Sequence, residues 1–157
     1  KLSSLVLHGS IYKRSKEQKR IVQNRFELMK SNRPASKDRA LRRWFSDKFL
    51  RENKEMYDKI FSMLDQNNHN NFLKVYKLFV NYEDDDQMLN NINTNTLVTT
   101  GQYDVGSTTE MAKNLSEKIK GAKYIEIKDG KHLCSIECAK KFNKTVELFV
   151  DQNYDEA

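Results

Sequence analysis

The stretch "TLVTTGQYDVGST" (residues 96–108) decides the fold of this 157-residue chain. Its first five residues have the β-branched and apolar character of a buried strand, which Gly101 would end. Asp104 follows three positions later. An Asp just before a helix most often caps that helix. Here, however, Ser107 and Glu110 form the S-x-x-E pattern of a capping box, which would already provide the cap. We therefore predict that Asp104 lies on the loop at the carboxyl end of the strand, where open α/β sheets bind ligands.

The sequence after this stretch alternates between helix and strand. Residues 108–121 have helical spacing, residues 122–128 are predicted to form a strand, and residues 137–150 a final helix. Strand, helix, strand and helix with short connections are typical of parallel βα units. Gly121 falls where the first of these helices would end, so we expect it to adopt the left-handed conformation.

The sequence before this stretch begins with one strand and continues as helices. Residues 4–8 form a continuous apolar run, which predicts a strand in the centre of a sheet. From residue 15 to residue 82 the apolar residues recur at helical spacing, and Pro34 is predicted to start a new helix.

A histidine provides a partner for Asp104. His132 follows Asp104 by 28 residues and comes directly after the next predicted strand. Because the carboxyl ends of neighbouring parallel strands meet at one edge of a sheet, we expect the two side chains to lie close together. A solvated loop histidine is the alternative interpretation of His132.

Composition limits the class of protein. With 38% hydrophobic and 32% charged residues the chain is polar and globular, and no run of 18 apolar residues could span a membrane. Its two cysteines, Cys134 and Cys138, form no disulfide framework, which favours a reducing cytoplasm.

The charge is unevenly distributed along the chain. Residues 1–60 carry 17 lysines and arginines against 7 aspartates and glutamates, whereas the remainder carries 11 against 15. A basic front half is compatible with an anionic small molecule, with solvated helix faces, or with nucleic acid bound through residues 13–59. The basic residues alternate with acidic ones along the predicted helices, which disfavours the nucleic-acid hypothesis.

The residues from 97 to 150 resemble the C-terminal part of α/β-hydrolases. They look most like the 3-oxoadipate enol-lactonase branch, with its D-x-G-S-T-x-x-M signal, its "I-x-G-A" signal and its H-L-x-x-I-E signal. "LRRWFSDKF" (residues 41–49) is similar to the Trp-bearing helix of that branch's helical cap, and "KLSSLVLHGS" (residues 1–10) resembles the strand that precedes the cap. Asn95 stands where that branch usually has proline.

The resemblance implies the C-terminal half of an α/β-hydrolase fold, a short parallel sheet with flanking helices that carries a helical cap. Residues 1–12 would be a core strand, residues 13–83 the cap, and residues 84–157 a βαβα core. Asp104 and His132 would be the acid and base of a Ser-His-Asp triad that hydrolyses an ester or an anionic lactone. The substrate-binding residues would be Arg43, Trp44 and Val105, and no cofactor is implied.

The nucleophile is missing. No G-x-S-x-G elbow occurs in the sequence. Ser10, Ser107 and Cys134 do not lie on a predicted strand-to-helix elbow, which disfavours each of them as a nucleophile. "LHGS" (residues 7–10) could also be the strand end that supplies oxyanion-hole amides, but no elbow follows it. A catalytically inactive hydrolase-fold fragment, or an interaction module, is therefore the alternative hypothesis.

Two expectations concern binding partners. His132, Cys134 and Cys138 lack a clear fourth ligand, so we predict no metal site. The strand at residues 4–8 would normally pair with the strand that bears the nucleophile, and without it an apolar edge is exposed. We therefore expect a homo-oligomer, or another association through this strand edge.

Overall fold

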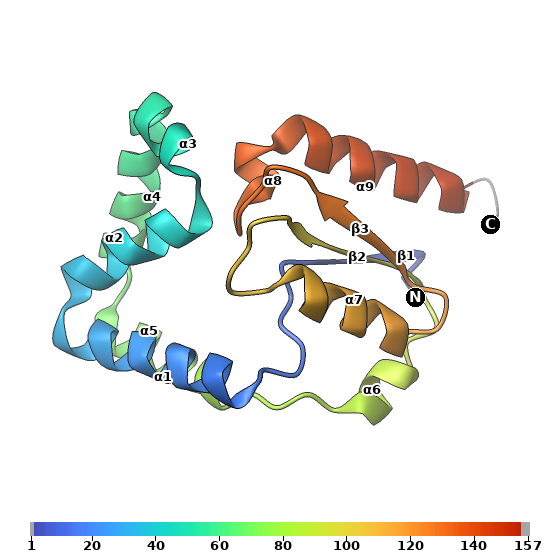
Figure 1. The fold of residues 1–157 in the computed structure, drawn as a ribbon, viewed down its shortest axis with the longest axis horizontal. Coiled ribbons are helices and arrows are strands. Elements are labelled where there is room, and N and C mark those ends of the chain that lie inside the picture. The colour runs from blue at the N-terminus through green and yellow to red at the C-terminus, as the bar shows by residue number, and fades with distance from the viewer. Residues whose placement is uncertain (1, 155–157) are drawn as a thin grey trace. The chain divides into compact units, whose positions relative to one another are not determined.

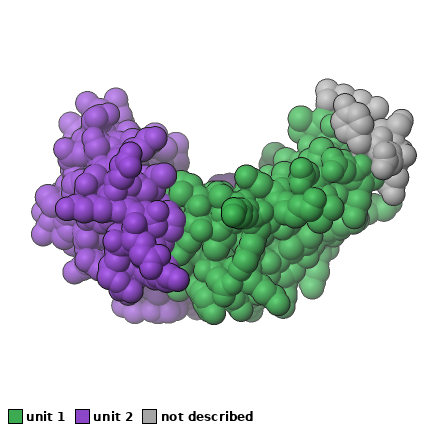
Figure 2. All heavy atoms as spheres, turned by 90° about the horizontal axis from the view of Figure 1, so that it is seen from above, with its two compact units in different colours: residues 1–12, 84–157 green, residues 13–83 purple. Residues whose placement is uncertain are grey.

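The structure is a computed structural model that describes residues 2–154. The chain divides into two compact units, shown in different colours in Figure 2. The first, which we call the sheet unit, consists of Lys1–Tyr12 and Asp84–Ala157, and the second, the helical unit, is Lys13–Glu83. In chain order the elements in Figure 1 are β1 (Ser4–His8), α1 (Lys16–Ser31), α2 (Arg33–Trp44), α3 (Asp47–Glu52), α4 (Lys54–Gln66), α5 (His69–Asn81), α6 (Asp86–Asn90), β2 (Asn95–Gly101), α7 (Thr109–Lys118), β3 (Lys123–Ile127), α8 (Cys134–Glu137) and α9 (Ala139–Tyr154).

The sheet unit is built on three parallel strands in the order β1-β2-β3. β2 is the central strand: Ser4 pairs with Asn95 on one side, and Leu97 pairs with Lys123 on the other. All the residues of β2 after Asn95 are buried, as expected for a strand that has a neighbour on both edges and helices on both faces. The predicted parallel βα arrangement is therefore confirmed.

Helices cover both faces of this sheet, and Figure 1 shows α7 and α9 on opposite sides of it. α7 presents Met111, Leu115 and Ile119 to a core that includes Val98 of the central strand. α9 contacts all three strands and contributes the buried Phe149. Each buried side chain of this size stabilises the fold by about 1.5–3 kcal/mol relative to an exposed one.

The prediction that residues 4–8 form a central strand was wrong. Their extent agrees with β1, but among residues 2–154 this strand pairs with β2 alone and so lies at the edge of the sheet. A continuous apolar run indicates that helices cover both faces of a strand in a parallel sheet. It does not indicate whether the strand has a neighbouring strand on one edge or on both.

The cap of α7 also differs from the prediction. Thr108, not Ser107, is the N-cap residue, and its hydroxyl accepts a hydrogen bond from the Met111 N–H at 3.2 Å. The Ser107 hydroxyl instead donates to the carbonyl oxygen of Gly9, 2.7 Å away. The hydroxyl of either Ser107 or Thr108 could cap the helix. Because the Ser107 hydroxyl is engaged with Gly9, 98 positions earlier in the chain, Thr108 is the residue that does so. Gly121 has a φ of +75°, which confirms its predicted left-handed conformation.

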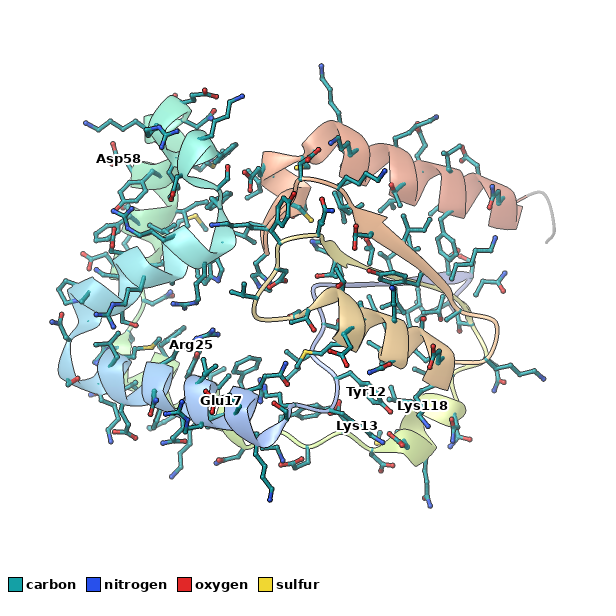
Figure 3. The ribbon with its side chains drawn as sticks, viewed as in Figure 1. Tyr12, Lys13, Glu17, Arg25, Asp58 and Lys118 are labelled. Atoms are coloured by element: carbon teal, nitrogen blue, oxygen red, sulfur yellow. The ribbon has the colours of Figure 1, made fainter. Side chains whose placement is uncertain are left out.

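A buried tyrosine ties the two segments of the sheet unit together. Tyr12 follows β1, and its hydroxyl donates to the Asp86 carboxylate on α6 at 2.9 Å. The Lys118 ammonium lies 3.8 Å from the same carboxylate. Figure 3 labels Tyr12 and Lys118 close to α6. The segment that leaves the sheet unit after β1 is thus joined to the segment that returns to it at α6.

The helical unit consists of α1 to α5, in agreement with the helical spacing of its sequence. α1 begins with a capping box formed by Ser15 and Gln18, and Asn32 caps α2, whose first turn contains Pro34. α1 packs against both α2 and α5. No helix among residues 2–154 is long and apolar enough to cross a membrane.

The end of β2 is pressed against the loop that follows β3. A Cβ atom added to Gly101 would lie 2.2 Å from the carbonyl oxygen of Lys131 and 2.5 Å from that of Gly130. The neighbouring Tyr103 N–H donates to the Gly130 carbonyl at 2.8 Å, so the two loops are joined backbone to backbone. Only glycine permits this approach, because any side chain at residue 101 would collide with main-chain atoms.

We predict that Gly101→Ala lowers the free energy of unfolding by about 3 kcal/mol, because the added methyl group meets rigid backbone. Gly121→Ala is the control: a Cβ atom there meets nothing within 4 Å, so only the left-handed backbone is strained. Its expected cost is about 1 kcal/mol. Urea unfolding of both variants tests the prediction, and equal losses would contradict it.

Candidate active site

The candidate site lies on the two loops that follow β2 and β3 in the sheet unit. Asp104 is held on the first loop by its own backbone, since its N–H donates to the Gly101 carbonyl at 3.0 Å. His132 stands on the second loop, between β3 and α8. The parallel register brings the ends of these strands together, with Gly101 beside Ile127. The loops therefore leave the same edge of the sheet side by side.

The structure brings Asp104 and His132 into contact. Nδ1 of His132 lies 2.7 Å from Oδ2 of Asp104, which is within hydrogen-bonding distance. Because a carboxylate oxygen accepts, Nδ1 carries the proton and donates it. The carboxylate side chain is 1% exposed, whereas that of His132 is 34% exposed. The acidic partner is thus buried while the imidazole reaches the surface.

The Asp104 carboxylate has further donors on its other oxygen. Oδ1 accepts from the backbone N–H of Gly106 at 2.7 Å and from that of Ser107 at 3.0 Å. The Thr100 hydroxyl lies 3.3 Å from Oδ2 and donates over a shorter distance, 2.7 Å, to the Ser107 carbonyl. These contacts fix the carboxylate and leave Oδ2 directed at the imidazole.

These hydrogen bonds set the charge of Asp104. Burial on its own would raise the pKa of this carboxyl group, but the hydrogen bonds from His132 and from the backbone of Ser107 and Gly106 outweigh that effect. The pKa of Asp104 is therefore lower than its ordinary value. The group is a carboxylate at neutral pH, which is the form that can orient and stabilise an imidazolium.

The second loop is held against the first by several backbone contacts. The Gln102 N–H donates to the Ile127 carbonyl at 3.0 Å, and the Gln102 side chain accepts from the Asp129 N–H at 3.1 Å. Gly9, at the end of β1, approaches the ring of His132 so closely that a Cβ atom there would lie 3.3 Å from Cε1. The imidazole is therefore placed by all three strand ends.

His8 is a neighbour of the pair that the sequence did not single out as a site residue. Its Nε2 lies 3.7 Å from the sulfur of Cys134, and its ring packs against Phe142 at 4.6 Å. Burial lowers the pKa of His8, and the nearby His132 lowers it further. The signal that could have found His8 is its position at the carboxyl end of β1, the edge at which open α/β sheets bind ligands.

Two of the disfavoured nucleophiles are buried in this region. Burial raises the pKa of the Cys134 thiol to about 12, so it is not a thiolate at neutral pH. The Ser107 hydroxyl is buried and engaged with Gly9. Both cysteines are free, and no group of three His, Cys, Asp or Glu side chains that could hold a metal occurs among residues 2–154.

The predicted substrate contacts are divided between the two units. Val105 follows Asp104 on its loop and is 62% exposed. Arg43 and Trp44 lie at the end of α2 in the helical unit. Their role as substrate contacts stays a prediction.

Comparisons with known proteins identify the fold. No family model and no curated protein matches the sequence. An enol-lactonase from Burkholderia xenovorans LB400 has a similar structure, with a TM-score of 0.83 and 22% identity over 96% of this chain and 56% of the other. A bromoperoxidase from Bacillus anthracis has a TM-score of 0.82 and 20% identity, over 95% of this chain and 58% of the other. A thermophilic esterase from Thermogutta terrifontis has a TM-score of 0.78 and 19% identity, over 97% of this chain and 57% of the other.

The three parallel strands with their flanking helices thus match part of an α/β-hydrolase fold, as the sequence predicted. The chain spans a little more than half the length of the structures that it matches. At this level of identity the similarity establishes the fold, and the activity follows only from a proposal about the site.

We predict that Asp104→Asn lowers the free energy of unfolding by about 2 kcal/mol at pH 7, because hydrogen bonds to a buried charge are lost. The folded-state pKa of Asp104 lies below the unfolded value, which is about 3.9. The stabilisation is therefore complete above about pH 4 and is lost as the pH falls through the folded pKa. Urea unfolding between pH 7 and pH 3 should show the difference from wild type shrinking below pH 4.

Asp129→Asn is the matched control for this experiment. Hydrogen bonding to Lys141 also lowers the pKa of Asp129, but this pair is exposed to solvent. Screening leaves such surface pairs with little effect on stability. A difference between wild type and Asp104→Asn that grew as the pH fell would contradict the assignment of Asp104 as the buried, stabilised carboxylate.

Proposed function

We propose that this chain supplies the acid and base of an α/β-type hydrolase that cleaves an ester or lactone through a Ser-His-Asp triad. The observation that carries the proposal is the 2.7 Å hydrogen bond from His132 to the buried Asp104 at the carboxyl edge of the sheet. The serine would come from a segment outside this sequence, since no G-x-S-x-G elbow occurs within it.

In the proposed reaction the serine hydroxyl attacks the substrate carbonyl. His132 takes the hydroxyl proton on Nε2, because Nδ1 is engaged with Asp104. Asp104 remains ionised, holds the imidazole in this tautomer and stabilises the imidazolium that forms. The imidazolium then returns the proton to the leaving alkoxide oxygen, and water hydrolyses the acyl-enzyme by the same route in reverse.

The proposed substrate is an anionic ester or lactone that resembles a 3-oxoadipate enol-lactone. Three observations support this choice: the similarity to an enol-lactonase, the malate bound in the structure of the Thermogutta esterase, and the basic composition of residues 1–60. Arg43, Trp44 and Val105 are the residues that we expect to contact the substrate. A bromoperoxidase shares the fold, so the substrate class needs a direct assay.

We predict that the 157-residue chain alone hydrolyses an activated ester such as p-nitrophenyl acetate no faster than its His132→Ala variant does. An acid–base pair without a nucleophile or an oxyanion hole lacks the main sources of rate acceleration; one oxyanion donor alone is worth about 100–1,000-fold. Spectrophotometric rates of both proteins test this. A rate that His132→Ala abolishes, with an acyl adduct visible by mass spectrometry, would reveal a nucleophile within the chain.

The matching positive experiment extends the chain by the sequence that precedes Lys1 in its gene. We expect the extended protein to hydrolyse esters, and His132→Ala or Asp104→Asn to lower kcat by about 10⁴-fold or more. Asp129→Asn, which changes an exposed carboxylate, should leave kcat unchanged. An extended protein that contains no G-x-S-x-G elbow and no activity would favour the alternative hypothesis, an inactive hydrolase-fold module.

We further predict that the isolated chain associates through β1. This strand has one hydrogen-bonded neighbour among residues 2–154, so a row of backbone donors and acceptors is left on its outer edge. A second copy can satisfy that edge by strand pairing. Light scattering at tens of micromolar protein should show a dimer or a larger assembly. A monomer under these conditions would contradict the prediction.

A further inference from the structure

His8, at the end of β1, contacts the segment that carries His132. Its Nε2 lies 3.7 Å from the sulfur of Cys134, which is the first residue of α8 and follows His132 by two positions. The ring of His8 also packs against Phe142 of α9, with the ring centroids 4.6 Å apart. The end of β1 is therefore in contact with both of the helices that follow His132 in the chain.

The loop that carries His132 is wrapped closely around Cys134. The Cys134 side chain is fully buried, and its backbone N–H donates to the Lys131 carbonyl at 3.2 Å. A Cβ atom added to Gly130 would lie 2.3 Å from the Cβ atom of Cys134, so the backbone of residue 130 passes directly over this side chain. A shift of Cys134 would therefore displace the chain on both sides of His132.

A second contact from the same strand end reaches the imidazole of His132 itself. A Cβ atom added to Gly9, the residue after His8, would lie 3.3 Å from Cε1 of His132. Gly9 is fixed in turn: its N–H donates to the Thr99 carbonyl at 2.9 Å, and its carbonyl accepts from the Ser107 hydroxyl at 2.7 Å. The end of β1 thus contacts the ring through Gly9 and the loop through His8.

The contact between His8 and Cys134 suits an uncharged imidazole. Burial raises the pKa of the Cys134 thiol to about 12, so the thiol keeps its hydrogen and is a donor. A neutral His8 with its proton on Nδ1 offers Nε2 as the acceptor. A protonated ring would instead direct an N–H group at sulfur, which accepts weakly. Its other N–H would be at Nδ1, which is buried and makes no hydrogen bond among residues 2–154.

The groups around His8 keep it neutral at neutral pH. Burial lowers the pKa of His8 most strongly, and the nearby His132 acts in the same direction. The backbone of Thr99 and the charge of Asp104 act in the opposite direction, but they are weaker. α8 contributes the protonated thiol of Cys134, and α9 contributes an aromatic ring. The pKa of His8 therefore lies below its ordinary value.

We propose that His8 is a positioning residue for His132, whose loop it holds against β1 through the thiol of Cys134 as long as the His8 ring is neutral. As the pH falls and His8 takes up a proton, Nε2 can no longer accept from the thiol. The loop then loses this attachment to the strand, and the orientation of His132 depends on the charge of a second histidine. The inference rests on the proposed function, because a fixed orientation matters if His132 acts as a base.

The test is nuclear magnetic resonance of the ring Cε1–H groups of the 157-residue chain, which contains three histidines. His8→Gln and His69→Gln assign the signals. Between about pH 8 and pH 5 the His132 signal of wild type should move in two steps. One step reports its own ring, and the other coincides with the titration of His8, below about pH 6.5. In His8→Gln the second step should be absent, because an amide does not titrate.

A double-mutant cycle tests the attachment through Cys134. His8→Phe keeps an aromatic ring against Phe142 but removes the acceptor, and Cys134→Ala removes the donor. Each should accelerate exchange of the His132 Nδ1 proton with water by about fivefold at pH 7, because one hydrogen bond is lost. The double variant should exchange no faster than either single variant, since both changes remove the same interaction. His8→Gln should exchange at the wild-type rate, because its amide oxygen can accept from the thiol.

Cys138→Ala is the matched control, because Cys138 is a free, partly buried thiol at the end of the same short helix. It should leave the exchange rate of the His132 proton unchanged. Circular dichroism shows whether each variant is folded, and His8→Gln, which retains an acceptor, keeps the test decisive if His8→Phe does not fold.

Three outcomes would overturn the proposal. The first is a His132 signal that moves in the same way in wild type and in His8→Gln. The second is equal exchange in His8→Gln and His8→Phe, and the third is additive effects of His8→Phe and Cys134→Ala. None of these measurements requires turnover, so their failure leaves the proposed reaction untouched. An inactive extended protein that shows the two-step titration would count against the proposed reaction alone.

Discussion

The buried carboxylate of Asp104 is the interaction on which the geometry of the candidate site depends. An ionised carboxylate without partners would be very costly at this depth. Two backbone N–H groups of its own loop satisfy one oxygen, and the imidazole of His132 satisfies the other. One charge therefore fixes the conformation of the first loop and attaches the second loop to it. Protonation of the carboxylate would weaken these charge-assisted hydrogen bonds, while the backbone hydrogen bonds from Gln102 and Tyr103 to the second loop would remain.

The sheet brings these partners within reach of each other. β2 and β3 are adjacent and parallel, so their carboxyl ends deliver Asp104 and His132 to one edge although 28 residues separate them. The absence of a side chain at Gly101 then lets the His132 loop touch the backbone of β2. Strand order sets the approximate position of the pair, and the close backbone contact sets the final hydrogen-bond distance. Both levels are needed for a triad-like arrangement.

The sequence predicted the parts of this fold that depend on local pattern. The strand at residues 4–8, the helical segments and the Asp104–His132 contact follow from apolar spacing and from the rule that parallel strand ends share an edge. The cap of α7 was misplaced by one residue, because a distant carbonyl engages Ser107 and leaves Thr108 as the cap. The central position predicted for β1 from its apolar run was wrong, because such a run indicates that the faces of a strand are covered and says nothing about its neighbours. The absence of a nucleophile-bearing strand was the better guide, since it indicated the exposed edge.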